Sequence, residues 1–420
     1  MVVDNKKHRR RDILRGVAGA GAVGVSTMAG CIGDPEDDDD EDLDDFDTVQ
    51  FGVLEPFTGD FAELAEERHQ GELLAIEQVN ESDDFEFEIE FEDYDTQLNA
   101  EDGIQAANQA IERDGADFLT GAISSSVALA INDVAEQNEV IYTPGAADVS
   151  ITGSNCNEYV FRFETSTAQI AEVLSQWTAE ELGGRLMYSI ADYAYGHSVH
   201  EEVEKRMEEY SDDYEEVTVV TPAEGAEDFE AHITQLMGDA EDADALVVGA
   251  TGGHLIRFLA QAAERGLHDE IPIVTTTGSF AVVRGGAGPA AYDIYSGTRY
   301  VPEVDTGTNP EFVEAYEDEY GAPPDNFSRV GYGSIMMVAE AIQTAESRDP
   351  TVVRETLSGM TFESIFGDIE IRECDQQAMN PVWMGRNVEP DDGEVAEVEL
   401  LTELDGESAA PDCEDTGCEL

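Results

Sequence analysis

From residue 48 onward, the chain alternates short apolar runs with amphipathic stretches of ten or more residues. In the first half, this pattern predicts strands at 49–54, 85–91, 118–120 and 140–142, and helices at 62–80, 100–113 and 126–138. In the second half, it predicts strands at 185–190, 216–220, 245–249 and 273–276, and helices at 168–182, 199–210, 229–237 and 255–264. Strands that alternate with helices of this length favour parallel sheets with helices on both faces. Two such runs predict an α/β fold of two doubly wound lobes with parallel central sheets.

The N-terminus has the pattern of an export signal. A basic start precedes a short run rich in Gly and Ala that ends at Met28-Ala29-Gly30-Cys31. This order is typical of a secretory signal, and the run is too short for a membrane-spanning helix. Arg10–Arg15 resembles the twin-arginine export motif, and Met28–Cys31 resembles a lipobox in which Cys31 becomes lipidated. We therefore expect a signal peptide over 1–30 and an anchor on Cys31; a chance apolar helix of the fold is the alternative.

Acidic residues dominate the chain. Asp and Glu number 95 against 21 Lys and Arg, which gives a formal net charge of −74. Molar salt shortens the Debye length to about 3 Å and screens such self-repulsion, so the composition resembles that of proteins from extreme halophiles. A polyanion also lacks the basic face that nucleic acids require. The densest acidic run, within 31–47, is expected to be a disordered tether behind the anchor, with no metal-binding role.

Four cysteines remain after Cys31. Disulfides persist in an oxidising location, and four cysteines allow three pairings. We favour Cys156–Cys374, which would tie distant segments of one domain, and Cys413–Cys418, which would close a small loop in a polar tail at 406–420. A zinc site is the alternative, but the spacing shows no CxxC and no nearby His pair.

Patterns for catalysis are weak. His197 and His200 are three residues apart on an expected helix near Asp192, and a surface helix face explains them better than a metal site. The sequence contains no G-x-S-x-G nucleophile turn and no phosphate-binding glycine loop with a lysine. The run Gly249–Gly253 follows a strand but has no basic residue, so it suits a small ligand or a tight turn. We expect no enzyme, no cofactor and no metal.

Three consecutive serines, Ser124–Ser126, follow a predicted strand at Gly121 and open a helix. Hydroxyls and free backbone N–H groups at a helix N-terminus bind a carboxylate or a carbonyl oxygen well. Plain N-capping by serine is the alternative, and the residues alone leave both interpretations open.

Short segments in a fixed order carry a family resemblance. They are Phe57–Gly59, Gly71, Leu74–Asn80, Asp93–Thr96, Gly121–Ser126, Tyr142–Ala146, Val160–Arg162, Asp192–Gly196, Asp228-Phe229, Gly331-Tyr332 and Ala339–Ile342. Together they span residues 48–390 and resemble the leucine/isoleucine/valine-binding protein family, the type I periplasmic solute receptors of ABC importers. With the lipobox and the acidic composition, the chain resembles a lipoprotein of the haloarchaeal type.

The resemblance implies a ligand site between two lobes. The residues that it assigns to ligand contacts are Ser124, Ser125, Gly145, Ala147, Tyr195, Thr251 and Thr277. Two of them depart from the family pattern: Ala147 lacks the hydroxyl of a threonine, and Thr277 stands where amino-acid receptors place a Glu for the ligand ammonium. An unpaired buried ammonium costs several kcal/mol. Either another acid such as Asp192 substitutes, or the ligand is an amide, a urea-like solute or a short organic acid.

The resemblance also implies a domain organisation and a function. Three crossover segments would join lobe one, 48–165 with 302–378, to lobe two, 166–301 with 379–405. The expected function is a lipid-anchored, extracellular substrate-binding protein that delivers a small polar solute, such as a branched-chain amino acid or an amide, to ABC permease subunits in the membrane. A ligand-sensing module on the same fold is the alternative, because fold alone does not determine function.

Overall fold

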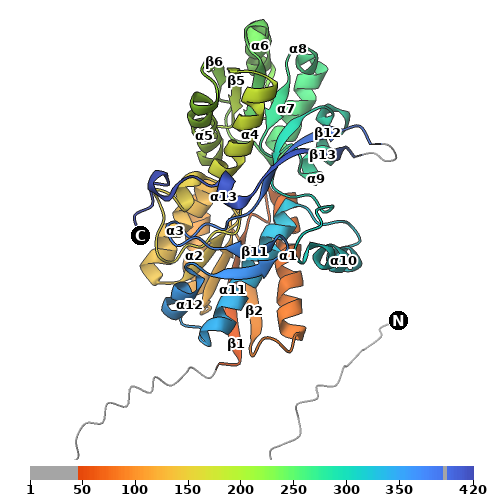
Figure 1. Cartoon of the computed structure of the whole chain (residues 1–420). Helices are drawn as coiled ribbons and strands as arrows, with labels where there is room; N and C mark the ends of the chain where they lie inside the picture. The colour runs from red at the N-terminus through yellow and green to blue at the C-terminus, as the bar shows by residue number, and fades with distance from the viewer. Residues whose placement is uncertain (1–45, 391–394) are drawn as a thin grey trace, which may run out of the picture. The chain divides into compact units, whose positions relative to one another are not determined.

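The computed structural model describes residues 46–390 and 395–420. The expected signal peptide at 1–30, the lipidation site Cys31 and all but the last two residues of the expected tether lie outside these ranges. Among the described residues, no helix is long and apolar enough to cross a membrane. Two large sheets, each with its own group of helices, and one two-stranded sheet make up the regular structure of the described residues (Figure 1).

The first lobe is built on a four-stranded parallel sheet in the order β2-β1-β3-β4. Its strands are β1 (Thr48–Glu55), β2 (Glu88–Asp95), β3 (Phe118–Gly121) and β4 (Ile141–Pro144). The other elements are α1 (Ala62–Glu81), α2 (Ala100–Glu112), α3 (Ser125–Asn138), α10 (Asn309–Tyr320), α11 (Asn326–Ala345), α12 (Pro350–Leu357), β10 (Thr361–Ser364) and β11 (Gly367–Glu370). Helices α1 and α11 pack so closely that Gly71 has no room for a side chain: a Cβ there would lie 1.9 Å from the Ser328 carbonyl oxygen.

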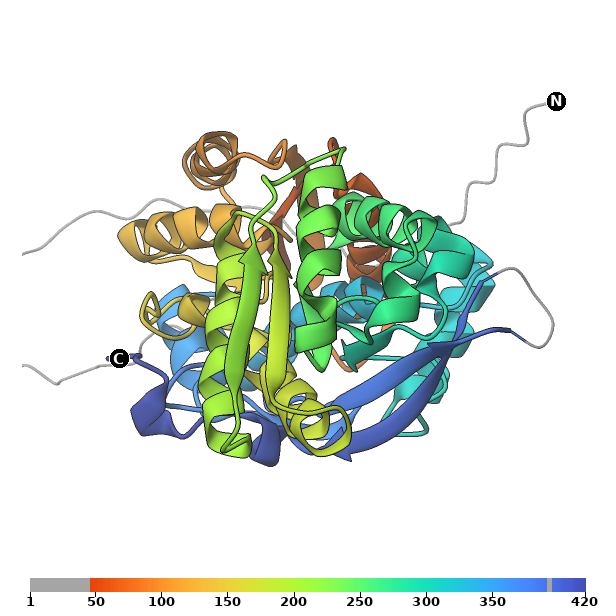
Figure 2. The same ribbon diagram turned by 90° about the horizontal axis from the view of Figure 1, so that it is seen from above.

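The second lobe is built on a seven-stranded sheet in the order β13-β12-β9-β8-β7-β5-β6. Its strands are β5 (Arg185–Ile190), β6 (Glu215–Val220), β7 (Ala245–Gly249), β8 (Ile273–Thr275), β9 (Tyr295–Thr298), β12 (Val382–Val388) and β13 (Glu397–Leu404). Its helices are α4 (Thr167–Glu181), α5 (Ala194–Tyr210), α6 (Glu230–Asp239), α7 (Gly252–Glu264), α8 (Leu267–Glu270) and α9 (Ala281–Ala287). Strands β5 to β9 are parallel, and the antiparallel hairpin β12–β13, blue in Figure 2, extends the sheet at the β9 edge. The sequence pattern did not predict β9 or this hairpin.

Most expected elements are present within a few residues, and the exceptions have local causes. The expected strand at 85–91 begins only at Glu88. Its neighbour β1 starts at Thr48, which pairs with Glu88, so earlier residues have no strand partner in β1. Helix α5 starts at Ala194 rather than at 199, and α7 starts at Gly252 rather than at 255. Both helices therefore begin directly at the loops that follow β5 and β7, which places those loops at helix N-termini.

The chain passes between the two sheets three times: between β4 and α4, between β9 and α10, and between β11 and β12. Two of these segments run side by side, since Arg162 pairs with Gln377 in a parallel bridge. The lobes also pack on each other directly, because Phe61 and Leu64 from the first lobe belong to the buried cluster of the second. Parallel strands from both sheets thus end at a shared cleft, where open α/β sheets bind ligands.

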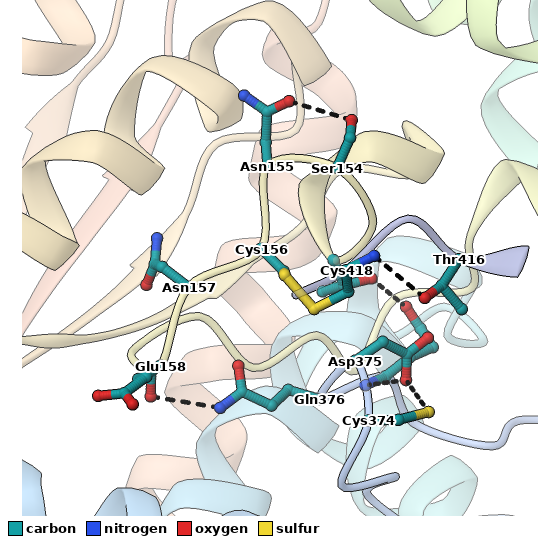
Figure 3. The surroundings of a disulfide bond; sticks show 12 residues. Ser154, Asn155, Cys156, Asn157, Glu158, Cys374, Asp375, Gln376, Thr416 and Cys418 are labelled. Atoms are coloured by element: carbon teal, nitrogen blue, oxygen red, sulfur yellow. Dashed lines mark hydrogen bonds between the residues drawn. A yellow bond between two sulfur atoms is a disulfide. The ribbon is translucent and has the colours of Figure 1, made fainter. Parts of the chain in front are cut away.

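The disulfide pairing differs from the expected one. Cys156 is bonded to Cys418, with 5.6 Å between their Cα atoms (Figure 3), and Cys374 is bonded to Cys413, with 6.0 Å. The expected pairs Cys156–Cys374 and Cys413–Cys418 are therefore wrong. The physical reason is that the C-terminal segment returns to the first lobe after packing its short helix α13 (Gly406–Ala409) on α4, so each of its cysteines meets a first-lobe cysteine.

Candidate functional site

Two adjoining cavities lie in the cleft between the lobes. The inner one, of about 20 Å³, is lined by first-lobe loops and by the loops and helix starts of the second lobe. The outer one, of about 390 Å³, opens beside it. Tyr193 and Thr251 line both, so the two cavities share one wall. A ligand with a small head and a larger body would match this arrangement.

The serine loop of the first lobe reaches this cleft. Ile123 lines the inner cavity, and the adjacent Ser124 is buried. Ser124 occupies the N-cap position of α3, yet its side chain makes no capping hydrogen bond, which disfavours the plain capping interpretation. The Ser125 hydroxyl accepts a hydrogen bond from the Asp148 backbone at 3.3 Å. Neither serine is among the lining residues, so their contact with a ligand stays a prediction.

The loop is held in a strained backbone. Gly121 has φ +117°, and a Cβ there would lie 2.1 Å from the Leu54 carbonyl oxygen. The next residue, Ala122, has φ +58°, which is rare for a residue with a side chain. Such strain persists where the surrounding structure enforces it and is common at ligand-binding loops. The glycine is thus required for the loop to turn from β3 into α3.

The second loop of the first lobe contributes Gly145 and Ala147, and both line the inner cavity. Gly145 must be a glycine for a packing reason, because a Cβ there would lie 2.5 Å from Nε of the buried Arg68. Ala147 presents only a methyl group, as the sequence indicated. This wall of the cavity is therefore nearly free of polar side chains.

The second lobe supplies the expected residues Tyr195, Thr251 and Thr277, which all line the inner cavity. Tyr195 lies on the first turn of α5, and its hydroxyl donates to Thr276 Oγ1 at 2.7 Å. Thr251 precedes α7, and its hydroxyl is buried without a hydrogen-bond partner among the described residues. Thr277 Oγ1 donates to the Ala250 carbonyl at 2.8 Å, so it can still accept a bond from a ligand.

Sequence reasoning missed half of the cavity wall. The missed lining residues are Ile123, Tyr193, Phe280, Arg299 and Phe327. The most consequential is Arg299, which follows β9 and is 2% exposed. The available signal was a basic residue in a chain with so few bases. The preceding strand, Tyr295–Thr298, is short and contains no apolar run, so the hydrophobic pattern does not reveal it.

Arg299 is held by a charged network. Its Nη1 lies 3.3 Å from Oε1 of Glu164, and its Nη2 donates to the Tyr195 hydroxyl at 2.9 Å. The same Glu164 oxygen lies 3.3 Å from Nη2 of Arg329. Burial lowers the pKa of Arg329 to about 10, which still leaves it charged at neutral pH. Two guanidinium groups thus share one carboxylate beside the cavity.

The two histidines considered for a metal site face different carboxylates. His197 Nε2 lies 2.9 Å from Asp192, and His200 Nε2 lies 2.7 Å from Glu216. Asp192 is thereby engaged outside the inner cavity lining. Among the described residues, no group of three or more His, Cys, Asp or Glu side chains is arranged to hold a metal ion.

Comparisons with known proteins agree with this architecture. The family model described as "Periplasmic binding protein" matches residues 48–394. Leu/Ile/Val-binding protein homolog 3 of Brucella melitensis is 26% identical over 339 residues, 77% of this chain and 87% of that protein. The leucine-, isoleucine-, valine-, threonine- and alanine-binding protein of Pseudomonas aeruginosa is 26% identical over 332 residues, 78% and 86% of the two chains.

Among solved structures, a solute-binding protein of an ABC transporter from Rhodopseudomonas palustris, in complex with 3,4-dihydroxybenzoic acid, superimposes with a TM-score of 0.78. It is 22% identical and covers 86% of this chain and 98% of its own. The expected fold class, two α/β lobes of the type I periplasmic-binding-protein fold, is confirmed. The match of the family model over most of the chain identifies it as a member of the periplasmic binding protein family.

Proposed function

We propose that this protein is an extracellular solute receptor of an ABC importer, anchored through Cys31 after twin-arginine export. It takes a small solute between its lobes and delivers it to membrane permease subunits. The bodies that close on the ligand are residues 48–165 with 302–378 and residues 166–301 with 379–405. The family membership and the relatives named for amino-acid binding support this function, and the leader motifs support the location.

The observation that carries the proposal is the pair of cavities lined from both lobes. A ligand there contacts both lobes at once, so it stabilises the closed arrangement over any open one. Direct contacts between the lobes already favour closure: Arg257 Nη2 of α7 lies 2.8 Å from Asp60 Oδ2 of the first lobe. The alternative function, a ligand-sensing module, would use the same site. It would differ from a transport receptor in the protein that the closed form contacts, which would not be an ABC permease.

The first prediction concerns Ser124. Ser124→Ala removes a buried hydroxyl that makes no capping bond, so we expect ligand affinity to fall about tenfold or more, the loss of one hydrogen bond to a charged group. The melting temperature without ligand should hardly change. Calorimetry in molar KCl, with ligands first found by a thermal-shift screen of amino acids, amides, ureas and short acids, measures both.

The matched control is Ser154→Ala, which changes an exposed serine outside the cleft and should alter neither quantity. If Ser124 is instead only a helix cap, the result reverses: stability falls by about 1 kcal/mol and affinity stays constant. Unchanged affinity in both Ser124→Ala and Tyr195→Ala would show that the ligand lies elsewhere.

A further inference from the structure

We propose that the ligand of this cleft is a small monocarboxylate with an apolar or aromatic body and without an ammonium group on the carbon next to the carboxylate. The proposal rests on the function proposed above and names the ligand class for that same site. Its basis is the set of buried polar atoms that the inner cavity presents. Arg299 and Thr251 are the residues that carry the argument.

The unpartnered polar atoms at the inner cavity suit an anion. Arg299 Nε is buried without a hydrogen-bond partner among the described residues, and it can only donate. The buried Thr251 hydroxyl also has no partner there and can donate as well. Both residues line the inner cavity, and both are more than nine-tenths buried. A carboxylate placed between them would accept a hydrogen bond from each and complete the unsatisfied guanidinium.

The local charge balance points the same way. Arg299 and Arg329 share Glu164, whose other oxygen accepts from the Asn326 side-chain amide at 3.0 Å. None of the residues that line the inner cavity is an Asp or a Glu. Within the trio of Arg299, Arg329 and Glu164, the positive charges exceed the negative by one, and burying an unpaired charge is costly unless an anion pairs with it. A ligand with one negative charge supplies that partner.

An α-amino acid fits this cavity poorly. Its ammonium is attached to the carbon next to the carboxylate, so it would remain in the inner cavity close to Arg299. Thr277, which also lines the inner cavity, offers only a hydroxyl. The acids Asp60 and Glu224 line the outer cavity instead, and Asp60 is already paired with Arg257; Glu164 is engaged by Arg299 and Arg329. The ammonium would thus be buried without a carboxylate and beside a cation.

Aromatic rings give the cavity its shape for the ligand body. Four of the ten lining residues are Tyr193, Tyr195, Phe280 and Phe327. The Arg299 guanidinium lies 5.3 Å from the centre of the Phe280 ring, which orients the cation between aromatic faces. Tyr193 lines both cavities, so the body of a bound acid that passes it enters the outer cavity. There, Phe61, Leu98 and Ala191 offer apolar contacts beside the acids Asp60 and Glu224, and a flat or branched apolar body suits the aromatic walls and this apolar part.

The test compares ligands that differ in one group. The probes are 4-methylpentanoate, its α-amino derivative leucine, its amide 4-methylpentanamide, and benzoate, each titrated into the purified protein by calorimetry in molar KCl. We expect one or both acids to bind, and we expect leucine and the amide to bind at least about tenfold more weakly than 4-methylpentanoate. Leucine binding as tightly as 4-methylpentanoate, or more tightly, overturns the ligand class but leaves the receptor function intact.

A variant then tests the assigned residue. Arg299→Gln should reduce acid affinity at least about tenfold while leaving binding of the neutral amide nearly unchanged, and Arg299→Lys should restore part of the loss. Arg113→Gln is the matched control, because Arg113 is an exposed arginine at the end of α2. Equal losses for the acid and the amide would overturn the role of Arg299. If no acid, amide or amino acid binds the unaltered protein, the receptor function itself fails.

Discussion

Two buried clusters of arginine and glutamate side chains differ in their charge balance: one has more carboxylates than guanidinium groups, and the other has more guanidinium groups than carboxylates. In the core of the first lobe, one arginine, Arg68, contacts two carboxylates, Glu55 and Glu72. Beside the cleft, Arg299 and Arg329 contact the same carboxylate oxygen of a single glutamate. Both clusters are almost fully buried, so neither can rely on water to balance its charge. The comparison shows two ways of compensating a surplus of charge. A bound proton compensates the surplus negative charge around Arg68, and by our proposal an anionic ligand compensates the surplus positive charge around Arg299.

The first cluster compensates internally. Burial, the largest cause, raises the pKa of Glu55 to about 8; Arg68 opposes the rise, and Glu72 adds to it. Near neutral pH, Glu55 is therefore largely protonated, and the cluster approaches neutrality. Arg68 also donates to Thr120 Oγ1 at 2.9 Å and to the Thr143 carbonyl at 3.4 Å, directly behind the loops that line the cleft. This closed cluster supports the site without contacting the cavity.

The largest predicted effect is on stability. Arg68→Met leaves Glu55 and Glu72 buried without their cation, so we expect the free energy of unfolding to fall by about 3–5 kcal/mol. Denaturant titration in molar KCl measures it. The exposed-site control Arg113→Met should change stability by less than about 0.5 kcal/mol. A loss below about 1 kcal/mol for Arg68→Met would mean that the two carboxylates do not depend on this arginine.

The matching change at the cleft should cost less stability. Arg299→Met leaves Glu164 with Arg329 and with the Asn326 amide, so we expect a loss of about 1–3 kcal/mol, the range for leaving one buried group less well satisfied. The same denaturant titration gives the comparison. If Arg299→Met destabilises the protein as strongly as Arg68→Met, the cleft cluster is structural, and the contrast between the two clusters disappears.

The smallest predicted effect, taken per pH unit, is the pH dependence that Glu55 causes. Its pKa is raised on folding, from 4.5 to about 8, so the folded state binds more protons in this range. Its contribution is complete below about pH 4.5 and is lost as the pH rises through 8, by at most about 1.4 kcal/mol per pH unit. In Glu55→Gln, the free energy of unfolding should therefore decline less steeply with rising pH. Equal slopes in Glu55→Gln and the unaltered protein, measured by melting between pH 5 and 9, would contradict this.

His69 is the neighbour that complicates this measurement. Burial lowers the pKa of its imidazole, but the hydrogen bond with Glu72 and the nearby carboxylates outweigh burial and raise it overall. A raised pKa for a base on folding also makes stability fall as pH rises. The double variant Glu55→Gln with His69→Gln should therefore remove the slope that remains in Glu55→Gln alone.

Part of the candidate site could be predicted because the family resemblance assigned Gly145, Tyr195 and Thr251 to it, and all three line the inner cavity. Gly145 and Thr251 stand in loops after strands and Tyr195 on the first turn of α5, and parallel strands bring such positions to one edge of a sheet. The alternation of apolar runs and helices located most strands because hydrophobic periodicity is a local signal. Arg299 could not be located by this route, because β9 has only four residues and is too short to show a clear period.

The cysteines show more clearly which contacts cannot be predicted from the sequence. Cys413 and Cys418 are close in sequence, which favoured a local pair, whereas the folded chain pairs Cys418 with Cys156, 262 residues away. Disulfide geometry depends on which Cα atoms come within about 7 Å, and that distance depends on how the C-terminal segment returns to the first lobe. Spacing along the chain contains no information about this return path.

The sequence by itself determined the α/β class, the two runs of strands and helices and the acidic composition, because periodicity acts over a few residues, and the family resemblance added several residues of the cleft. Only the tertiary structure decided which charges pair, such as Arg299 with Glu164 across 135 positions, and which cysteines meet. These pairings depend on the packing of distant segments. They also determine whether the cleft carries a net charge, and that is why the ligand class proposed here required the folded chain.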